Sequence, residues 1–207
     1  MPQTAILEGP PPIPEGDDSI HAADHADMEA LAVGTRTLMS LTAKRRPTPT
    51  EKKHVRDAIA TYLERTEFYK ARWHYLQLRR MQTLGVSAAK GGKSDCSEQA
   101  HDALFMGGKV AKVAVEDPSG LHWSGYGWTG TLLAANDDAE VDGTFLVGDL
   151  AIFGTSRSNT THVTTCRKKG TASTAIFTSN GSEAGPYATR LHYRPDLLGV
   201  FRPWSLR

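Results

Sequence analysis

Apolar residues recur at helical spacing through the first half of the chain, most clearly in residues 50–73. The apolar positions there fall on one stripe and charged residues fill the other face, as in a surface helix. Thr50 is expected to cap the start of this helix, with Glu51 in its first turn. Residues 72–92 are then predicted to leave the helix and form a loop that ends in two glycines.

A second helix is predicted from Cys96 to the pair Gly107-Gly108, because glycine is common immediately after the last helical residue. Residues 109–135 are rich in glycine and aromatic residues and are expected to form a loop. From residue 143 onward, short runs of apolar residues separated by turn residues are typical of strands. Four strands are expected, within residues 143–154, 162–170, 171–181 and 197–204.

Helices followed by an antiparallel set of strands predict the α+β fold class. The predicted domain covers residues 50–207, including its leading helix. Residues 1–49 are expected to form a partly flexible N-terminal extension, in which 8–18 are rich in proline, glycine and acidic residues. Residues 19–43 carry apolar residues at roughly helical spacing, and 44–50 read as a linker.

The charge of the chain argues against two classes of partner. Its 24 lysines and arginines against 23 aspartates and glutamates give a formal net charge of +1. This balance provides no general attraction to nucleic acid or to an anionic membrane, so neither is expected as a partner. The first residues have neither the basic start nor the apolar core of a secretory signal, so synthesis in the cytoplasm is expected.

Cys96 has an unusual position for a cysteine that only packs a core, because it stands at the predicted start of a helix. Asp95 is expected to cap this helix, and Glu98 falls where it would complete a reciprocal capping box. The positive end of the helix dipole favours the thiolate of Cys96, which is the nucleophilic form. The other cysteine, Cys166, is expected to pack, without a disulfide between the two.

Among the eight histidines, His162 is the candidate for a base that would activate Cys96. It is expected to begin an interior strand, which would hold the imidazole rigidly. The next strand ends in Ser179, Asn180 and Gly181, and one of these is expected to bind the imidazole and fix its tautomer. Taken alone, His162 is more simply read as a polar residue at a strand edge. Four other histidines have no distinctive setting: His74, His101, His122 and His192.

The order of these motifs resembles that of the NlpC/P60 family of papain-like cysteine peptidases, most of all those encoded by phages of actinobacteria. The resemblance spans about residues 70–204. It is carried by Trp73-His74-Tyr75, Asp95-Cys96-Ser97, DPSG, GYGWTGTLL, VGDLAIFG, His162-Val163, SNGSEAGP and YRPDLLGVFRPW. It implies a papain-like core in which a catalytic cysteine at a helix N-terminus packs on an antiparallel sheet.

The resemblance also implies a role for each residue of the candidate site. Cys96 would attack an amide carbonyl, and His162 would serve first as general base and then as general acid. Asn180 would orient His162, at a place where relatives often carry histidine. Tyr75 would help at the oxyanion side, where the backbone N–H of Cys96 would be the other donor.

Bacterial peptidoglycan is the substrate that the resemblance implies, commonly cut at the γ-D-glutamyl–diaminopimelate bond of its stem peptide. Asp95 and Ser97 match positions that can contact substrate. Trp123, Tyr126 and Trp128 are expected either to form a groove wall or to cover the core beneath a loop. Such an enzyme needs no cofactor, and it would act at the cell wall as an endolysin released at lysis or as part of the virion.

Other functions remain open alongside this one. Asn180 in place of histidine and the charged Glu98 favour a tail or wall-binding component with weak or no catalysis, which would bind phage tail proteins or the wall. An N-acetylmuramoyl-L-alanine amidase or a cross-bridge endopeptidase would use the same residues on another bond. A zinc peptidase is disfavoured and no metal is expected, because H-E-x-x-H is absent and His21 and His25 lack a third ligand.

Overall fold

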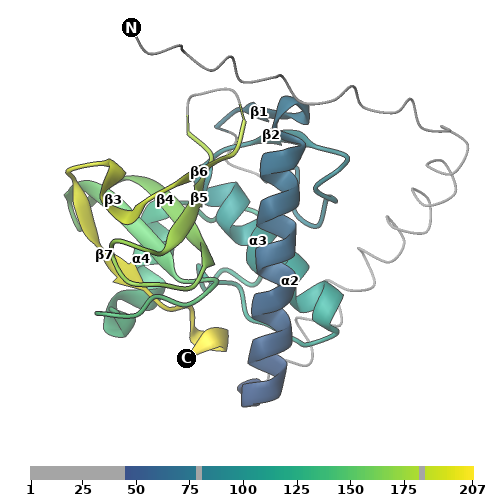
Figure 1. The fold of residues 1–207 in the computed structure, drawn as a ribbon, viewed down its shortest axis with the longest axis horizontal. Coiled ribbons are helices and arrows are strands. Elements are labelled where there is room, and N and C mark those ends of the chain that lie inside the picture. The colour runs from purple at the N-terminus through teal and green to yellow at the C-terminus, as the bar shows by residue number, and fades with distance from the viewer. Residues whose placement is uncertain (1–44, 78–80, 182–184) are drawn as a thin grey trace, which may run out of the picture. The chain divides into compact units, whose positions relative to one another are not determined.

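A five-stranded sheet is the main feature of the computed structural model, which describes residues 45–77, 81–181 and 185–207. All of its strand pairs are antiparallel, and the strand order is β6-β5-β4-β3-β7. Figure 1 shows the sheet in green to yellow beside the blue helix α2. The strands are β3 (Leu150–Ser156), β4 (Asn159–Lys168), β5 (Ile176–Ser179), β6 (Tyr187–Thr189) and β7 (Leu197–Phe201). The predicted α+β class is confirmed.

Three α-helices cover one face of this sheet. Helices α2 and α4 each pack on α3, and all three contact β4. A separate pair of parallel strands, β1 and β2, leads directly into α3. The bounds are α2 (Pro49–Phe68), α3 (Cys96–Ala111), α4 (Thr129–Asn136), β1 (Trp73–Tyr75) and β2 (Gly92–Ser94), with short 3₁₀ helices at Lys70–Arg72, Asp137–Ala139, Leu191–Tyr193 and Trp204–Leu206.

The start of α2 differs from the expected one by two residues. Thr48, not Thr50, is the N-cap: its hydroxyl accepts from the Glu51 N–H at 3.3 Å, and the Glu51 carboxylate accepts from the Thr48 N–H at 2.7 Å. Pro49 takes the first helical position, where its missing N–H would have no partner in any case. The last residues of the predicted linker 44–50 therefore begin the helix.

Helix α3 does not end at Gly107-Gly108, so that prediction was wrong. It continues to Ala111, and Lys112 adopts the left-handed conformation that closes it. A side chain at Gly107 would overlap Ile59 of α2. The glycine thus allows two helices to approach closely, and sequence reasoning took a packing residue for a helix end.

Four short elements lie where the sequence predicted loops or nothing. Strands β1, β2 and β6 have three residues each, which is too short to show a period. Helix α4 has eight residues and lies within the predicted loop 109–135 and just beyond it. Hydrophobic periodicity reveals only elements that are long enough to repeat the pattern, so these short elements could not be predicted from it.

The main sheet has a separate hydrophobic core on each face, because side chains alternate along strands. One core lies against the helices and includes Cys96. The other is closed by loop segments and 3₁₀ turns. We call the first the helix face, with Leu150, Ile152, Val163 and Phe201, and the second the loop face, with Ala151, Phe153, Cys166, Phe177 and Val200.

Residues 1–44 lie outside the described residues, and with them most of the predicted extension 1–49. The two histidines weighed as metal ligands, His21 and His25, lie there too, so these predictions stay predictions. Among the described helices, none combines the length and the apolar character needed to cross a bilayer.

Candidate functional site

Cys96 is the first residue of α3, as predicted, and Asp95 is its N-cap. The Asp95 carboxylate accepts from the Glu98 N–H at 2.8 Å and from the Ser97 hydroxyl at 2.7 Å. Asp95 and Ser97 are both buried. Their side chains thus have a structural role in the helix cap, and the predicted contact of these two residues with substrate stays a prediction.

Glu98 does not complete the expected reciprocal capping box. It is buried, and one carboxylate oxygen accepts from the Gln82 N–H at 2.5 Å and the Thr83 N–H at 2.6 Å. The Thr83 hydroxyl lies 2.8 Å from the same oxygen and 2.6 Å from the Asp102 carboxylate. Burial raises the pKa of Glu98. This charged residue, surprising in the sequence, anchors the loop before α3 to the helix.

The Cys96 sulfur lies between strand β4 and the start of α4. It is 4.0 Å from the Thr129 hydroxyl, and the Val163 backbone N–H acts on it as a donor. Burial and the charge of Asp95 raise the pKa of the thiol to about 11, although both donors oppose this shift. At neutral pH the group is therefore a thiol, so the helix dipole alone does not produce a thiolate.

His162 is the fourth residue of β4, whereas the sequence predicted that it would begin the strand. Its Nε2 lies 3.0 Å from the Ser179 hydroxyl of β5, which in turn lies 3.3 Å from the Tyr193 hydroxyl. Burial, followed by the charge of Arg194, lowers the pKa of His162 to about 4. The imidazole is therefore neutral at pH 7, which is the form that can accept a proton.

The thiol of Cys96 and the imidazole of His162 belong to opposite faces of the sheet. Val163 packs with Cys96 on the helix face. His162 is paired with Phe153 in the register of β3 and β4, and their rings lie 6.0 Å apart on the loop face. Within the described ranges, no hydrogen bond joins Cys96 to His162. The structure thus brings the cysteine to the strand of the histidine without joining the two groups.

Asn180 does not hold the imidazole, which corrects the role expected for it. Its Nδ2 donates to the Ser94 hydroxyl at 2.8 Å and to the Ser94 carbonyl at 3.2 Å. Ser179, one residue earlier, takes the orienting position instead. The reason is strand alternation: a shift of one residue places a side chain on the other face. Ser179 was among three residues that the sequence left open for this role.

Tyr75 lies near the start of α3, and its oxyanion role stays a prediction. It is paired with Ser94 in the parallel register of β1 and β2, two residues before Cys96. The Leu76 N–H also donates to the Ser94 carbonyl, at 3.1 Å. Ser94 thereby connects Tyr75 and Asn180 to the N-terminus of α3.

The three aromatic residues of the glycine-rich loop differ in their exposure to solvent. Trp123 is buried, and its ring packs edge-on against Phe105 with centroids 5.2 Å apart. It covers the core and is not a groove wall. Tyr126 and Trp128 are 57% and 42% exposed. Trp128 precedes Thr129, whose hydroxyl faces the Cys96 sulfur.

A buried His101–Asp117 pair supports this loop, although sequence reasoning found nothing distinctive in His101. Its Nδ1 donates to the Ser97 carbonyl at 2.6 Å, and its Nε2 lies 3.4 Å from the Asp117 carboxylate. Burial alone would raise the pKa of Asp117, but the nearby His101 and the hydrogen bonds from Ser119 lower it to about 2. A side chain at Gly127 would overlap the imidazole. The pair thus holds the loop against α3.

The second cysteine, Cys166, has the packing role that was expected. It is fully buried on the loop face, and both cysteines are free. Burial raises its pKa to about 12. Cys166 therefore offers a matched control for experiments on Cys96.

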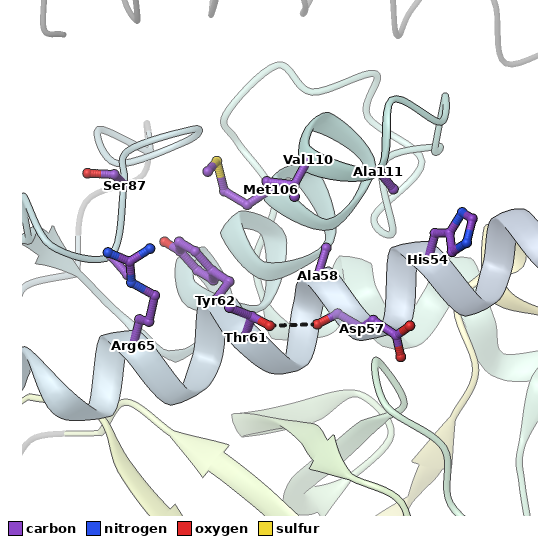
Figure 2. A pocket seen from close by; sticks show the side chains of 11 residues that line it. His54, Asp57, Ala58, Thr61, Tyr62, Arg65, Ser87, Met106, Val110 and Ala111 are labelled. Carbon is purple, nitrogen blue, oxygen red and sulfur yellow. Dashed lines mark hydrogen bonds between the residues drawn. The ribbon is translucent and has the colours of Figure 1, made fainter.

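A hollow of about 530 Å³ lies between α2 and α3, away from the candidate site. Figure 2 shows Arg65 and Tyr62 toward one end of it and His54 toward the other. Its lining includes none of Cys96, His162 and Ser179. This hollow therefore does not coincide with the candidate site.

Comparisons of the chain with protein-family models, with curated proteins and with solved structures give no match. The resemblance to NlpC/P60 peptidases therefore stays a prediction from the ordered motifs of the sequence, and any function must be argued from the residues around Cys96 and His162.

Proposed function

We propose that this chain is a cysteine peptidase that cleaves the stem peptide of bacterial peptidoglycan, with an NlpC/P60-like core. The observation that carries the proposal is the seat of Cys96 at the first position of α3, with its sulfur against the backbone of β4 next to His162. A neutral imidazole, anchored through Nε2 by Ser179, stands on the same strand. The motif order of the sequence supplies the substrate class.

The proposed reaction starts with transfer of the Cys96 proton to His162. The thiolate adds to the carbonyl carbon of the scissile amide, and His162 returns the proton to the departing amine as the C–N bond breaks. Water then hydrolyses the thioester, with His162 again as base. The backbone N–H of Cys96 and the Tyr75 hydroxyl would stabilise the oxyanion. The first step requires the imidazole to reach the sulfur. Because a strand's backbone sets the face that each side chain occupies, the proposal includes a local rearrangement of β4 at His162 when substrate binds.

Digestion of purified actinobacterial cell wall tests this proposal. The wild-type protein and the Cys166→Ala variant should release soluble muropeptides, whereas Cys96→Ala and His162→Leu should release none. Mass spectrometry of the fragments identifies the bond, since cleavage at γ-D-glutamyl–diaminopimelate leaves a free diaminopimelate amine and an N-acetylmuramoyl-L-alanine amidase leaves a free L-alanine amine. Equal release by the wild type and Cys96→Ala, or none by either, would remove the peptidase proposal.

A second function is favoured by one specific observation, the separation of thiol and imidazole onto opposite faces of the sheet. A wall-binding or tail component with this fold would need no contact between Cys96 and His162. It would sediment with cell wall or with tail proteins, and the Cys96→Ala variant would sediment equally well. Binding without release of muropeptides would support this function over the peptidase.

A further inference from the structure

Arg194 is fixed beside His162 by contacts on three sides. Its Nε and Nη2 donate to the two carboxylate oxygens of Asp196 at 2.9 and 2.7 Å. Nη2 also donates to the hydroxyl of Thr161, the residue before His162, at 3.3 Å. The guanidinium carbon lies 5.7 Å from the centre of the Phe153 ring. A planar group held in this way is already oriented for a ligand, so little side-chain entropy is lost on binding.

The same contacts place the guanidinium at the candidate catalytic site. Phe153 pairs with His162 across β3 and β4, and the ring of Tyr193, the residue before Arg194, lies 6.3 Å from the imidazole. The charge of Arg194 acts on His162, and Arg194 in turn responds to the Cys96 sulfur. The cation therefore lies within electrostatic reach of both groups that the proposed reaction uses.

One edge of the guanidinium is open. Asp196 and Thr161 occupy Nε and Nη2, while Nη1 has no hydrogen-bond partner within the described ranges. The Arg194 side chain is 36% exposed. A guanidinium carries five N–H donors, so both hydrogens of Nη1 remain available to an acceptor from solution. A carboxylate is the acceptor that matches this group best in charge.

We propose that Arg194 determines specificity by binding a free carboxylate of the substrate beside the scissile bond. This inference rests on the proposed peptidase function. A γ-linked glutamyl residue keeps its α-carboxylate free on the same residue that holds the scissile carbonyl. Conversion of that carboxylate to a carboxamide removes the charge and half of the acceptor capacity. Arg194 thus selects stem peptides with a free α-carboxylate over amidated ones.

Two synthetic peptides test the inference, L-Ala-γ-D-Glu-diaminopimelate and the same peptide with the glutamate α-carboxylate converted to carboxamide. Wild-type protein should cleave the acid with a kcat/KM at least about tenfold above that of the amide, as expected for one charge-assisted hydrogen bond. Arg194→Gln should bring the ratio close to one, chiefly through KM for the acid. Arg65→Gln removes the same charge from α2, beside the hollow of Figure 2, and should leave the ratio unchanged.

Binding by the Cys96→Ala variant separates this inference from the peptidase proposal. Calorimetric titration with each peptide should show tighter binding of the acid by about tenfold, and this preference should disappear in Cys96→Ala/Arg194→Gln. If the wild type cleaves neither peptide but the preference in binding depends on Arg194, the peptidase proposal fails and the carboxylate site stands. Equal binding of acid and amide, or a preference that survives Arg194→Gln, overturns the role of Arg194.

Discussion

The helix face and the loop face of the main sheet each hold half of the predicted catalytic set. Cys96 lies on the helix face with Asn180, whose amide binds Ser94 at the start of α3. His162 lies on the loop face, where Ser179 holds its Nε2. The nucleophile is thus tied to the helix cap, while the base is tied to the strands. The thiol and the imidazole are therefore each held in place by separate contacts. Substrate binding would have to bring these two groups together.

The chemistry of the two groups follows the same division. Burial raises the pKa of Cys96 to about 11 and lowers that of His162 to about 4. Both are neutral at pH 7, so neither stabilises a charge on the other at rest. This differs from a preformed thiolate–imidazolium pair, in which each charge shifts the partner's pKa toward ionisation. Measurements of thiol reactivity and of protein stability can therefore test whether the groups on the two faces act independently of each other.

The largest expected effect concerns the reactivity of the thiol. An increase in the pKa of Cys96 from 9.0 to about 11 reduces its thiolate fraction near neutral pH by about a hundredfold. Alkylation by iodoacetamide at pH 7 should therefore be about a hundredfold slower in the native Cys166→Ala variant than in the same variant unfolded in denaturant. A native rate equal to or above the unfolded rate would show an activated thiolate and would break the division between the faces.

The next effect is a loss of stability at low pH that originates on the loop face. The fold lowers the pKa of His162 from 6.5 to about 4 and thus favours the neutral form, so its contribution is complete above about pH 6.5. As the pH falls toward 4, the unfolded chain takes up a proton that the folded chain does not. Linkage gives a loss of about 2 kcal/mol at pH 5 relative to pH 8. Urea unfolding of the wild type should show this loss, and His162→Leu should lack that part of it.

The sequence predicted the long elements and the position of Cys96 at the start of α3. Hydrophobic periods long enough to recognise occur in the leading helix of the domain, in the helix that starts at Cys96, and in strands β3, β4, β5 and β7. Asp95 was identified as the cap of α3 from its position alone. These predictions depend on local chemistry, which the sequence displays directly.

The parts that sequence reasoning missed depend on register and on distant contacts. Neither spacing nor the family resemblance could distinguish Ser179 from Asn180, because a one-residue difference decides which face a side chain occupies. Glu98 read as a capping residue, yet its partners are the backbone amides of Gln82 and Thr83 in a separate loop. Arg194 follows the last tyrosine of the chain and shows no local sign of its place beside His162. The one feature of the sequence that could have drawn attention to Arg194 is the YRPD segment around it, which belongs to the motifs that carry the resemblance.

A double-mutant cycle between His162 and Ser179 should show a moderate coupling within the loop face. Their hydrogen bond of 3.0 Å is buried, and such a bond contributes about 1 kcal/mol to stability. The cycle uses His162→Leu, Ser179→Ala and the double variant, with free energies of unfolding measured in urea at pH 8. An interaction energy near zero would show that Ser179 does not hold the imidazole in solution and would remove the orienting role given to it.

The smallest expected effect is the coupling across the sheet, between Cys96 and His162. Within the described residues the two side chains share no hydrogen bond. Cys96 packs in the core of the helix face, whereas His162 contacts Ser179 and the ring of Phe153, so their effects on stability should add within about 0.5 kcal/mol. The cycle uses Cys96→Ala and His162→Leu at pH 8, where both groups are neutral, and the His162–Ser179 cycle is its internal positive control. A coupling above about 1 kcal/mol would mean that thiol and imidazole already interact in the free protein. In that case no movement of His162 on substrate binding would be needed. The peptidase proposal would then rest on a Cys96–His162 pair that is already formed in the free protein.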